Sequence, residues 1–150
     1  MKTLLIGLGV MGSNHFRVLK MLLPKNDILI YDKNKKILSS NLKINKIKQS
    51  KSLNTLLSIS KKVIIATPTR THFNLIKQSI KLGVKYIFVE KPLVKSLHES
   101  KKVINLVKKN NVELNVGLIE RFNSIFIPLQ KILKKEKIIN LDLIRTARVI

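Results

Sequence analysis

The chain has 150 residues, enough for one domain with a buried core, and it contains no cysteine, no histidine spacing typical of a metal site and no apolar run long enough to cross a bilayer. Its net charge of +22 comes mostly from lysines spread over the whole chain, and only 5% of its residues are aromatic. These features exclude disulfides and predict a cytoplasmic protein with no metal, no membrane segment and no specific nucleic-acid partner.

The chain begins with an apolar strand, predicted over residues 2–6, which leads into Gly-Leu-Gly-Val-Met-Gly at 7–12 and then into a helical pattern. In this arrangement Gly7 allows a tight turn, Gly9 lets the backbone approach a pyrophosphate, and Gly12 lets helix and strand pack closely. The helix N-terminus offers free N–H groups and its positive dipole end to the phosphates. The motif predicts a dinucleotide site formed by Gly7, Gly9, Val10, Met11 and Gly12.

A second strand, predicted over 27–31, ends at Asp32, which lies 20 residues after Gly12. An acid at this distance typically binds the ribose hydroxyls of adenosine and repels a 2′-phosphate. We therefore predict NAD as the cofactor, with NADP possible because Lys33 stands next to the acid. A surface aspartate in a turn is the alternative, and the strand–glycine–helix context disfavours it.

Short apolar runs and amphipathic stretches alternate up to residue 118, which is typical of a parallel sheet covered by helices on both faces. Further strands are predicted at about 44–48, 63–66, 86–89 and 114–116, giving six in a doubly wound α/β unit. The residues predicted to face inward are Met11, His15, Val18, Leu19 and Leu22 in the first helix and Leu97, Ile104 and Val107 in the last.

Two loops that follow predicted strands carry polar residues and a proline. The run at 63–66 leads into Thr-Pro-Thr-Arg-Thr-His at 67–72, where Thr69 or Thr71 is expected to cap the next helix. The run at 86–89 leads into Glu-Lys-Pro at 90–92. Both loops lie at the carboxyl ends of parallel strands, where open α/β sheets bind ligands.

The pattern changes after Gly117. An amphipathic helix with Ile125, Leu129, Ile132 and Leu133 on one face precedes a long strand predicted over 138–149. This strand has no partner in the first sheet, and an unpaired edge of this kind promotes aggregation. We expect a Rossmann-type domain over residues 1–118 and the beginning of a second α/β domain over 119–150.

Three motifs in this order resemble the Gfo/Idh/MocA oxidoreductases, the glucose–fructose oxidoreductase and inositol dehydrogenase-like enzymes. They are the glycine motif ending at His15, Thr67-Pro68-Thr69-x-Thr71-His72 and Glu90-Lys91-Pro92-Leu93, and Gly117-x-x-Glu120-Arg121-Phe122-Asn123 adds similarity to sugar-nucleotide dehydrogenases. The resemblance implies NAD(P)-dependent hydride transfer from a sugar, polyol or sugar-nucleotide hydroxyl. It also implies an N-terminal Rossmann domain and a C-terminal substrate domain that forms the interface of a homo-oligomer in the full-length protein.

The resemblance also implies residue roles. Lys91 would be catalytic, beside the nicotinamide and the substrate hydroxyl, with Pro92 holding its turn. The residues implied to line the cofactor's path are Thr67, Pro68, Thr69, His72 and Glu90. The family's main catalytic pair, an Asp and a His, falls beyond residue 150, so we expect the 150-residue chain alone to be inactive.

The residues by themselves leave other interpretations open. Lys91 can be a surface lysine, His72 a capping or exposed residue, and Glu90 a structural acceptor, while His15 is expected to pack rather than react. At the level of the whole chain, a non-catalytic nucleotide-binding or sensing module is the main alternative. A Rossmann methyltransferase is a further one, which the Thr-Pro and Glu-Lys-Pro motifs disfavour.

Overall fold

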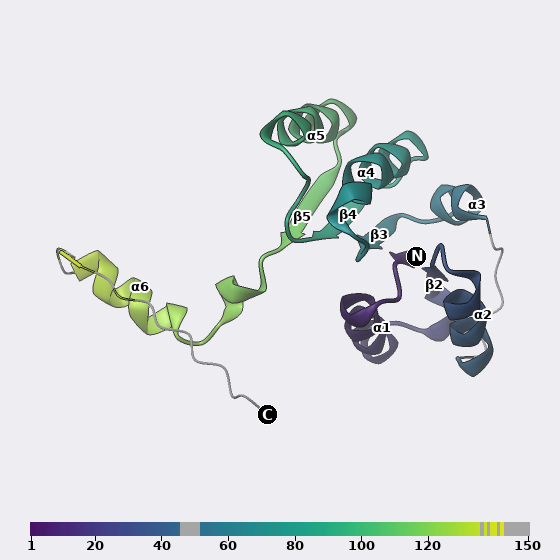
Figure 1. The fold of residues 1–150 in the computed structure, drawn as a ribbon, viewed down its shortest axis with the longest axis horizontal. Coiled ribbons are helices and arrows are strands. Elements are labelled where there is room, and N and C mark those ends of the chain that lie inside the picture. Colours follow the sequence, from purple (N-terminus) through teal and green to yellow (C-terminus); the bar gives the residue numbers. More distant parts are fainter. Residues whose placement is uncertain (46–51, 136, 138, 141, 143–150) are drawn as a thin grey trace. The chain divides into compact units, whose positions relative to one another are not determined.

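The computed structural model describes residues 1–45, 52–135, 137, 139, 140 and 142. The chain divides into two compact units, Met1–Gly117 and Leu118–Ile150. The first unit is a sheet with helices and the second is helical in its described part (Figure 1).

The first unit is built on a parallel sheet whose strand order is β2-β1-β3-β4-β5. Its strands are β1 (Thr3–Ile6), β2 (Ile28–Tyr31), β3 (Lys62–Ile65), β4 (Tyr86–Glu90) and β5 (Glu113–Gly117). Ile6 at the end of β1 pairs with Tyr31 of β2 and with Ile65 of β3, so the loops after these three strands begin at one level. The order reverses between β1 and β3, which is where doubly wound sheets bind ligands. The predicted α/β Rossmann class is confirmed.

The described residues form five strands, so the prediction of six is wrong for this part of the chain. Ile44, where the additional strand was predicted to begin, is the last residue of α2 (Lys35–Ile44), and 46–48 lie outside the described residues. Asn34 stabilises this helix because its side chain accepts hydrogen bonds from the N–H groups of the second and third helical residues at 3.0 and 3.3 Å. Most of the strand predicted at 138–149 also lies outside the described residues.

Two apolar layers cover the sheet, one on each face. The remaining helices of this unit are α1 (Val10–Leu22), η1 (Lys25–Asp27), α3 (Leu53–Ser58), η2 (Thr69–Thr71), α4 (His72–Lys81) and α5 (Leu97–Asn110). Leu5 of β1 packs with the buried side chains of α1 and α2, while Leu4 and Ile6 pack with those of α3, α4 and α5. The alternation follows from the strand period of two.

The predicted inward faces of α1 and α5 are partly wrong. In α1 the buried residues are Gly12, Phe16 and Leu19, whereas Leu22 is 71% exposed. A Cβ on Gly12 would lie 1.9 Å from the carbonyl oxygen of Gly7, so residue 12 must face the strand and thereby sets the rotation of the helix. The other predicted inward residues that are exposed are Met11, Val18, Leu97 and Ile104.

The N-terminal cap of α5 agrees with the sequence pattern, whereas that of α4 does not. Ser96 caps α5 by accepting a hydrogen bond from the Glu99 N–H at 3.2 Å, as the Ser-x-x-Glu pattern predicts. Thr71 precedes α4 but makes no side-chain cap, because its hydroxyl donates to the Pro68 carbonyl at 2.8 Å. The expectation that Thr69 or Thr71 caps α4 through its side chain is therefore wrong.

The second unit contains η3 (Ile119–Phe122) and α6 (Phe126–Lys135). Pro128 is the third residue of α6, where the missing N–H leaves no intrahelical hydrogen bond broken. None of the described residues of α6 is buried, although the helix is amphipathic. Across both units, no described helix is long and apolar enough to span a membrane.

Candidate functional site

The turn from β1 into α1 contains two glycines that the fold requires, Gly7 in the loop and Gly12 in the first turn of the helix. Gly7 has a φ of +94°, and a Cβ on it would lie 2.4 Å from the Ala66 carbonyl oxygen. Its N–H donates to the Tyr31 carbonyl at 2.8 Å, so the turn is tied to the end of β2. Together with the close contact of Gly12 to Gly7, this brings the N-terminus of α1 directly over the end of β1.

Gly9 differs from its two neighbours in the motif. Apart from Gly9 itself and its immediate chain neighbours, no heavy atom of the described residues lies within 4 Å of the position that a Cβ on Gly9 would occupy. Its φ of −68° is also accessible to any residue. The fold therefore does not require glycine here, and the open space above its backbone is the space that a pyrophosphate on the α1 N-terminus needs. Val10 and Met11, which follow it, are exposed.

Asp32 is fixed at the end of β2 by two backbone N–H groups. Its Oδ2 accepts from Leu8 at 2.8 Å, and its Oδ1 accepts from Asn34 at 2.7 Å. The first bond links the acid to the glycine loop, a contact that the spacing did not predict. A carboxylate has about four acceptor positions, so two remain for a pair of ribose hydroxyls.

The loop after β3 lies against the same glycine turn. A Cβ on Gly7 would be 3.0 Å from the Thr67 Cγ2, and the Thr67 hydroxyl is 2.7 Å from that of Thr71. Pro68 is exposed and Thr69 is half-buried. The structure therefore brings the Thr-Pro-Thr segment to the carboxyl edge of the sheet beside the first glycine.

His72 is completely buried and joins the two loops. Its Nε2 lies 2.8 Å from the Thr67 carbonyl oxygen, and its Nδ1 lies 3.0 and 3.2 Å from the carbonyl oxygens of Pro92 and Leu93. A ring in this position is neither an exposed residue nor a cap. It has no exposed surface with which to line the cofactor's path directly, so the implied direct role is replaced by one of holding both loops together.

Glu90 forms a pair with His15 that the sequence did not predict. Glu90 is 6% exposed, and its Oε1 lies 2.7 Å from the Nε2 of His15 on α1. The His15 ring also packs edge-on against Phe88, with ring centroids 5.3 Å apart. A Cβ on Gly117 would meet Phe88 at 2.9 Å and the Glu90 Oε2 at 3.2 Å, so this glycine gives the pair its space. The available signal was a histidine in the first turns of the helix after the glycine motif and an acid at the end of β4.

Lys91 and Pro92 follow this pair, both exposed and joined by a cis peptide bond. The buried acid and the buried His72 hold the residues on either side of Lys91, while its own side chain faces solvent. An ammonium placed in this way is accessible to a ligand at the carboxyl edge of the sheet.

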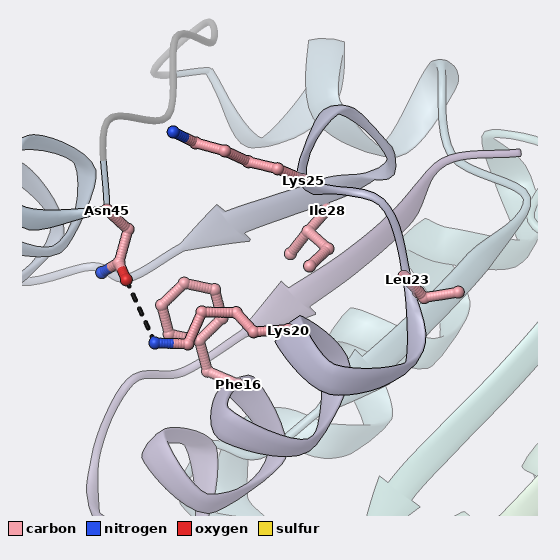
Figure 2. Close-up of a pocket in the computed structure, with 6 residues that line it drawn as sticks. All are labelled: Phe16, Lys20, Leu23, Lys25, Ile28 and Asn45. Atoms are coloured by element: carbon pink, nitrogen blue, oxygen red, sulfur yellow. Dashed lines mark hydrogen bonds between the residues drawn. The ribbon is translucent and has the colours of Figure 1, made fainter.

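A hollow of about 180 Å³ is lined by residues from α1, η1 and β2 and by Asn45 at the end of α2 (Figure 2). Lys20 crosses it, donating to the Asn45 side chain at 3.2 Å and lying 4.9 Å from the centre of the Phe16 ring. Because Ile28, which begins β2, lines it, this hollow lies at the amino end of the sheet, away from the glycine loop. Within the described residues, no group of three metal-ligating side chains gathers.

Comparison with known proteins agrees with this geometry. Residues 1–118 match the GFO_IDH_MocA model, an oxidoreductase family with an NAD-binding Rossmann fold. A 61-residue segment is 49% identical to the scyllo-inositol 2-dehydrogenase (NAD(+)) of Bacillus subtilis, covering 41% of this chain and 18% of that protein.

Solved structures show the same fold. The UDP-N-acetylglucosamine 3-dehydrogenase GnnA from Acidithiobacillus ferrooxidans superposes with a TM-score of 0.76 and 25% identity, over 87% of this chain and 42% of its own. A scyllo-inositol dehydrogenase from Lactobacillus casei, solved with NAD(H) and scyllo-inositol, gives a TM-score of 0.76 at 15% identity, over 90% and 41%.

The chain thus spans less than half the length of these solved structures. The matched residues 1–118 include the glycine loop, Asp32 and both loops that His72 joins. The chain therefore belongs to the Gfo/Idh/MocA oxidoreductase family and carries its NAD-binding Rossmann domain.

Proposed function

We propose that this chain is the cofactor-binding part of a dehydrogenase that acts on a hydroxyl of a sugar, polyol or sugar nucleotide. The observation that carries the proposal is the open backbone at Gly9, at the N-terminus of a helix and next to an acid tied to the same loop. The similar proteins named above act on an inositol and on a nucleotide sugar, which supports this substrate class.

Different residues of the chain bind the different groups of NAD. The N-terminus of α1 receives the pyrophosphate over Gly9, and Asp32 accepts hydrogen bonds from the adenosine ribose. The residues that we propose to contact the cofactor are Gly7, Gly9, Val10, Met11, Gly12, Asp32, Thr67, Pro68, Thr69, Glu90, Lys91 and Pro92. His72 positions the last of these loops from beneath.

Bound NAD supplies an acceptor for the hydride that leaves the hydroxyl-bearing carbon. Lys91 is the one catalytic residue that we propose within this chain. Its exposed ammonium sits between two anchored residues, where it can hold the substrate hydroxyl and assist the movement of its proton.

The domain assignment, 1–118 for the cofactor and 119–150 for the beginning of a substrate domain, is part of the proposal. The unburied amphipathic helix α6 supports it, because such a helix needs a further layer to cover its apolar side. We further propose that the 150-residue chain alone lacks turnover, that the complete protein is a homo-oligomer, and that it works in the cytoplasm.

The proposal is tested by titrating the purified chain with NAD, with S-adenosylmethionine as the competing nucleotide. We expect NAD to bind and S-adenosylmethionine not to bind. The sharper test is Gly9→Val, because the space at Gly9 is empty in the fold and filled only by a ligand. The free energy of unfolding of this variant should fall by only about 1 kcal/mol, because Gly9 is the N-cap residue of α1 and valine is a poorer cap. Its NAD affinity should fall at least about tenfold.

Unchanged NAD affinity in Gly9→Val, with the fold intact, would contradict the placement of the pyrophosphate. Binding of S-adenosylmethionine in preference to NAD would contradict the oxidoreductase proposal itself. Circular dichroism on each variant keeps the two readouts, folding and binding, separate.

A further inference from the structure

Three adjacent strands of the first unit each begin directly after or close after a lysine, at the edge of the sheet opposite the glycine loop. Lys2 precedes β1, Lys61 precedes β3 and Lys85 precedes β4. The Lys61 N–H donates to the Lys2 carbonyl at 3.2 Å, and the Lys85 N–H donates to the Lys61 carbonyl at 3.1 Å. Because adjacent strands lie about 4.8 Å apart, these lysines form a short row across three strands.

Two further lysines adjoin this row. Lys62 is the first residue of β3, and Lys25 lies in η1, just before β2. The η1 segment is tied to the row, since the Lys2 ammonium donates to the Asn26 carbonyl. We call Lys2, Lys25, Lys61, Lys62 and Lys85 the amino-edge lysines. Lys2 is half-buried, and the other four are exposed.

The contacts of these lysines leave their charge uncompensated. Lys2 and Lys85 each donate to a backbone carbonyl group, the latter to that of Asn110 at 3.3 Å. In the described part of the first unit, the acids at this edge are Asp27 and Glu113. Asp27 is paired with the N-terminal ammonium at 3.3 Å. An anion that reaches this edge therefore meets an excess of positive charge.

The helix ends at the same edge do not account for this excess. Each of α1, α4 and α5 leads into the beginning of a strand, and a helix C-terminus carries about half of a negative charge. Each of these helices has a lysine of its own in the last turn, namely Lys20, Lys81 and Lys108. The amino-edge lysines thus lie beside helices whose dipoles are already offset.

An exposed aromatic ring lies among these cations. Tyr86, the first residue of β4, is 46% exposed, and the Lys62 ammonium lies 5.9 Å from the centre of its ring. Lysines around an exposed ring are typical of surfaces that bind single-stranded nucleic acid, because the ammonium groups contact phosphates while a base stacks on the ring. An acidic peptide would use the charge but offers no base to stack on the ring.

We propose that the amino edge of the sheet binds single-stranded nucleic acid without sequence preference. The amino-edge lysines bind the phosphates, and Tyr86 stacks against a base. The proposed cofactor site lies at the carboxyl edge of the same sheet, so nucleic acid and NAD bind at the same time. This interaction goes beyond the proposed dehydrogenase activity and does not depend on it.

The experiment follows the fluorescence anisotropy of a labelled oligothymidylate of about 15 nucleotides as the purified chain is added, between about 50 mM and about 200 mM salt. The double variant Lys61→Ala/Lys85→Ala removes two phosphate contacts. It should therefore lower the slope of log affinity against log salt concentration by about 1.4. Tyr86→Leu should weaken binding at least about fivefold and leave that slope unchanged.

The matched control is Lys36→Ala/Lys95→Ala. It removes the same charge from exposed positions toward the carboxyl edge, one at the beginning of α2 and one just before α5. We expect an unchanged slope and an affinity lowered by less than about twofold. Circular dichroism checks that every variant is folded, and saturating NAD should leave the affinity of the parent for the oligonucleotide unchanged.

An equal change of slope and affinity in the two double variants would overturn the inference, because the attraction would then be a property of the net charge alone. Binding of polyglutamate as tightly as oligothymidylate would also overturn it, since no base would be needed. Displacement of the oligonucleotide by NAD would place the nucleic acid in the cofactor site and contradict the assignment to the amino edge.

Discussion

The two units of the chain differ in how far their apolar side chains are buried. In Met1–Gly117, Phe16 is 4% exposed and belongs to a continuous core on one face of the sheet. In Leu118–Ile150, Phe122 is 89% exposed, and α6 contains no buried residue among those described. The first unit thus has the core of an independent domain, whereas the described residues of the second unit form an amphipathic helix with no buried side chain. The difference indicates that the core that stabilises the described part of the chain lies in the first unit, which is also the part that matches an NAD-binding Rossmann fold.

The largest expected effect is on that core. Phe16→Ala should lower the free energy of unfolding by about 3–5 kcal/mol, because it removes a buried ring and leaves a cavity. Phe122→Ala, the same change in the second unit, should alter it by less than about 0.5 kcal/mol. Urea unfolding followed by circular dichroism measures both. Equal effects in the two variants would show that the second unit also has a core.

A smaller effect is expected at the junction of the two loops. His72→Leu keeps a similar side-chain volume but removes the ring nitrogens that lie 2.8–3.2 Å from the Thr67, Pro92 and Leu93 carbonyl oxygens, and should destabilise the first unit by about 2–4 kcal/mol. The affinity for NAD should also fall, because the loops after β3 and β4 are no longer joined through His72. This affinity is measured under conditions where the variant is folded. His98→Leu, at an exposed position on α5, is the control and should change neither quantity.

The smallest effect is expected from ending the chain at Gly117, where β5 and the first unit both end. The free energy of unfolding of the shortened protein should lie within about 1 kcal/mol of the parent's, and its affinity for NAD should be unchanged. It should also aggregate less, since the exposed apolar residues of the second unit are gone. Light scattering and NAD titration measure the two properties. A large loss of stability would contradict the contrast between the units.

Much of the fold and part of the site were predictable because their signals are local. The alternation of apolar runs with amphipathic stretches gave the parallel α/β class, and the spacing from Gly12 to Asp32 located the acid that the Leu8 N–H binds. Ile44 shows the limit, since a short apolar stretch suits helix and strand alike: the sequence predicted that a strand begins there, and in the structure it is the last residue of α2.

The sequence by itself determined the fold class, the glycine loop and the loops after β3 and β4, because strand period, turn chemistry and motif spacing act between near neighbours. Only the tertiary structure decided which face of α1 is buried, since two apolar stripes compete and the contact of Gly12 with Gly7 selects one. It also decided that His72 is buried beneath both loops and that His15 meets Glu90, 75 residues away in the chain. Contacts across such separations depend on how the strands are ordered, and no local pattern carries that information.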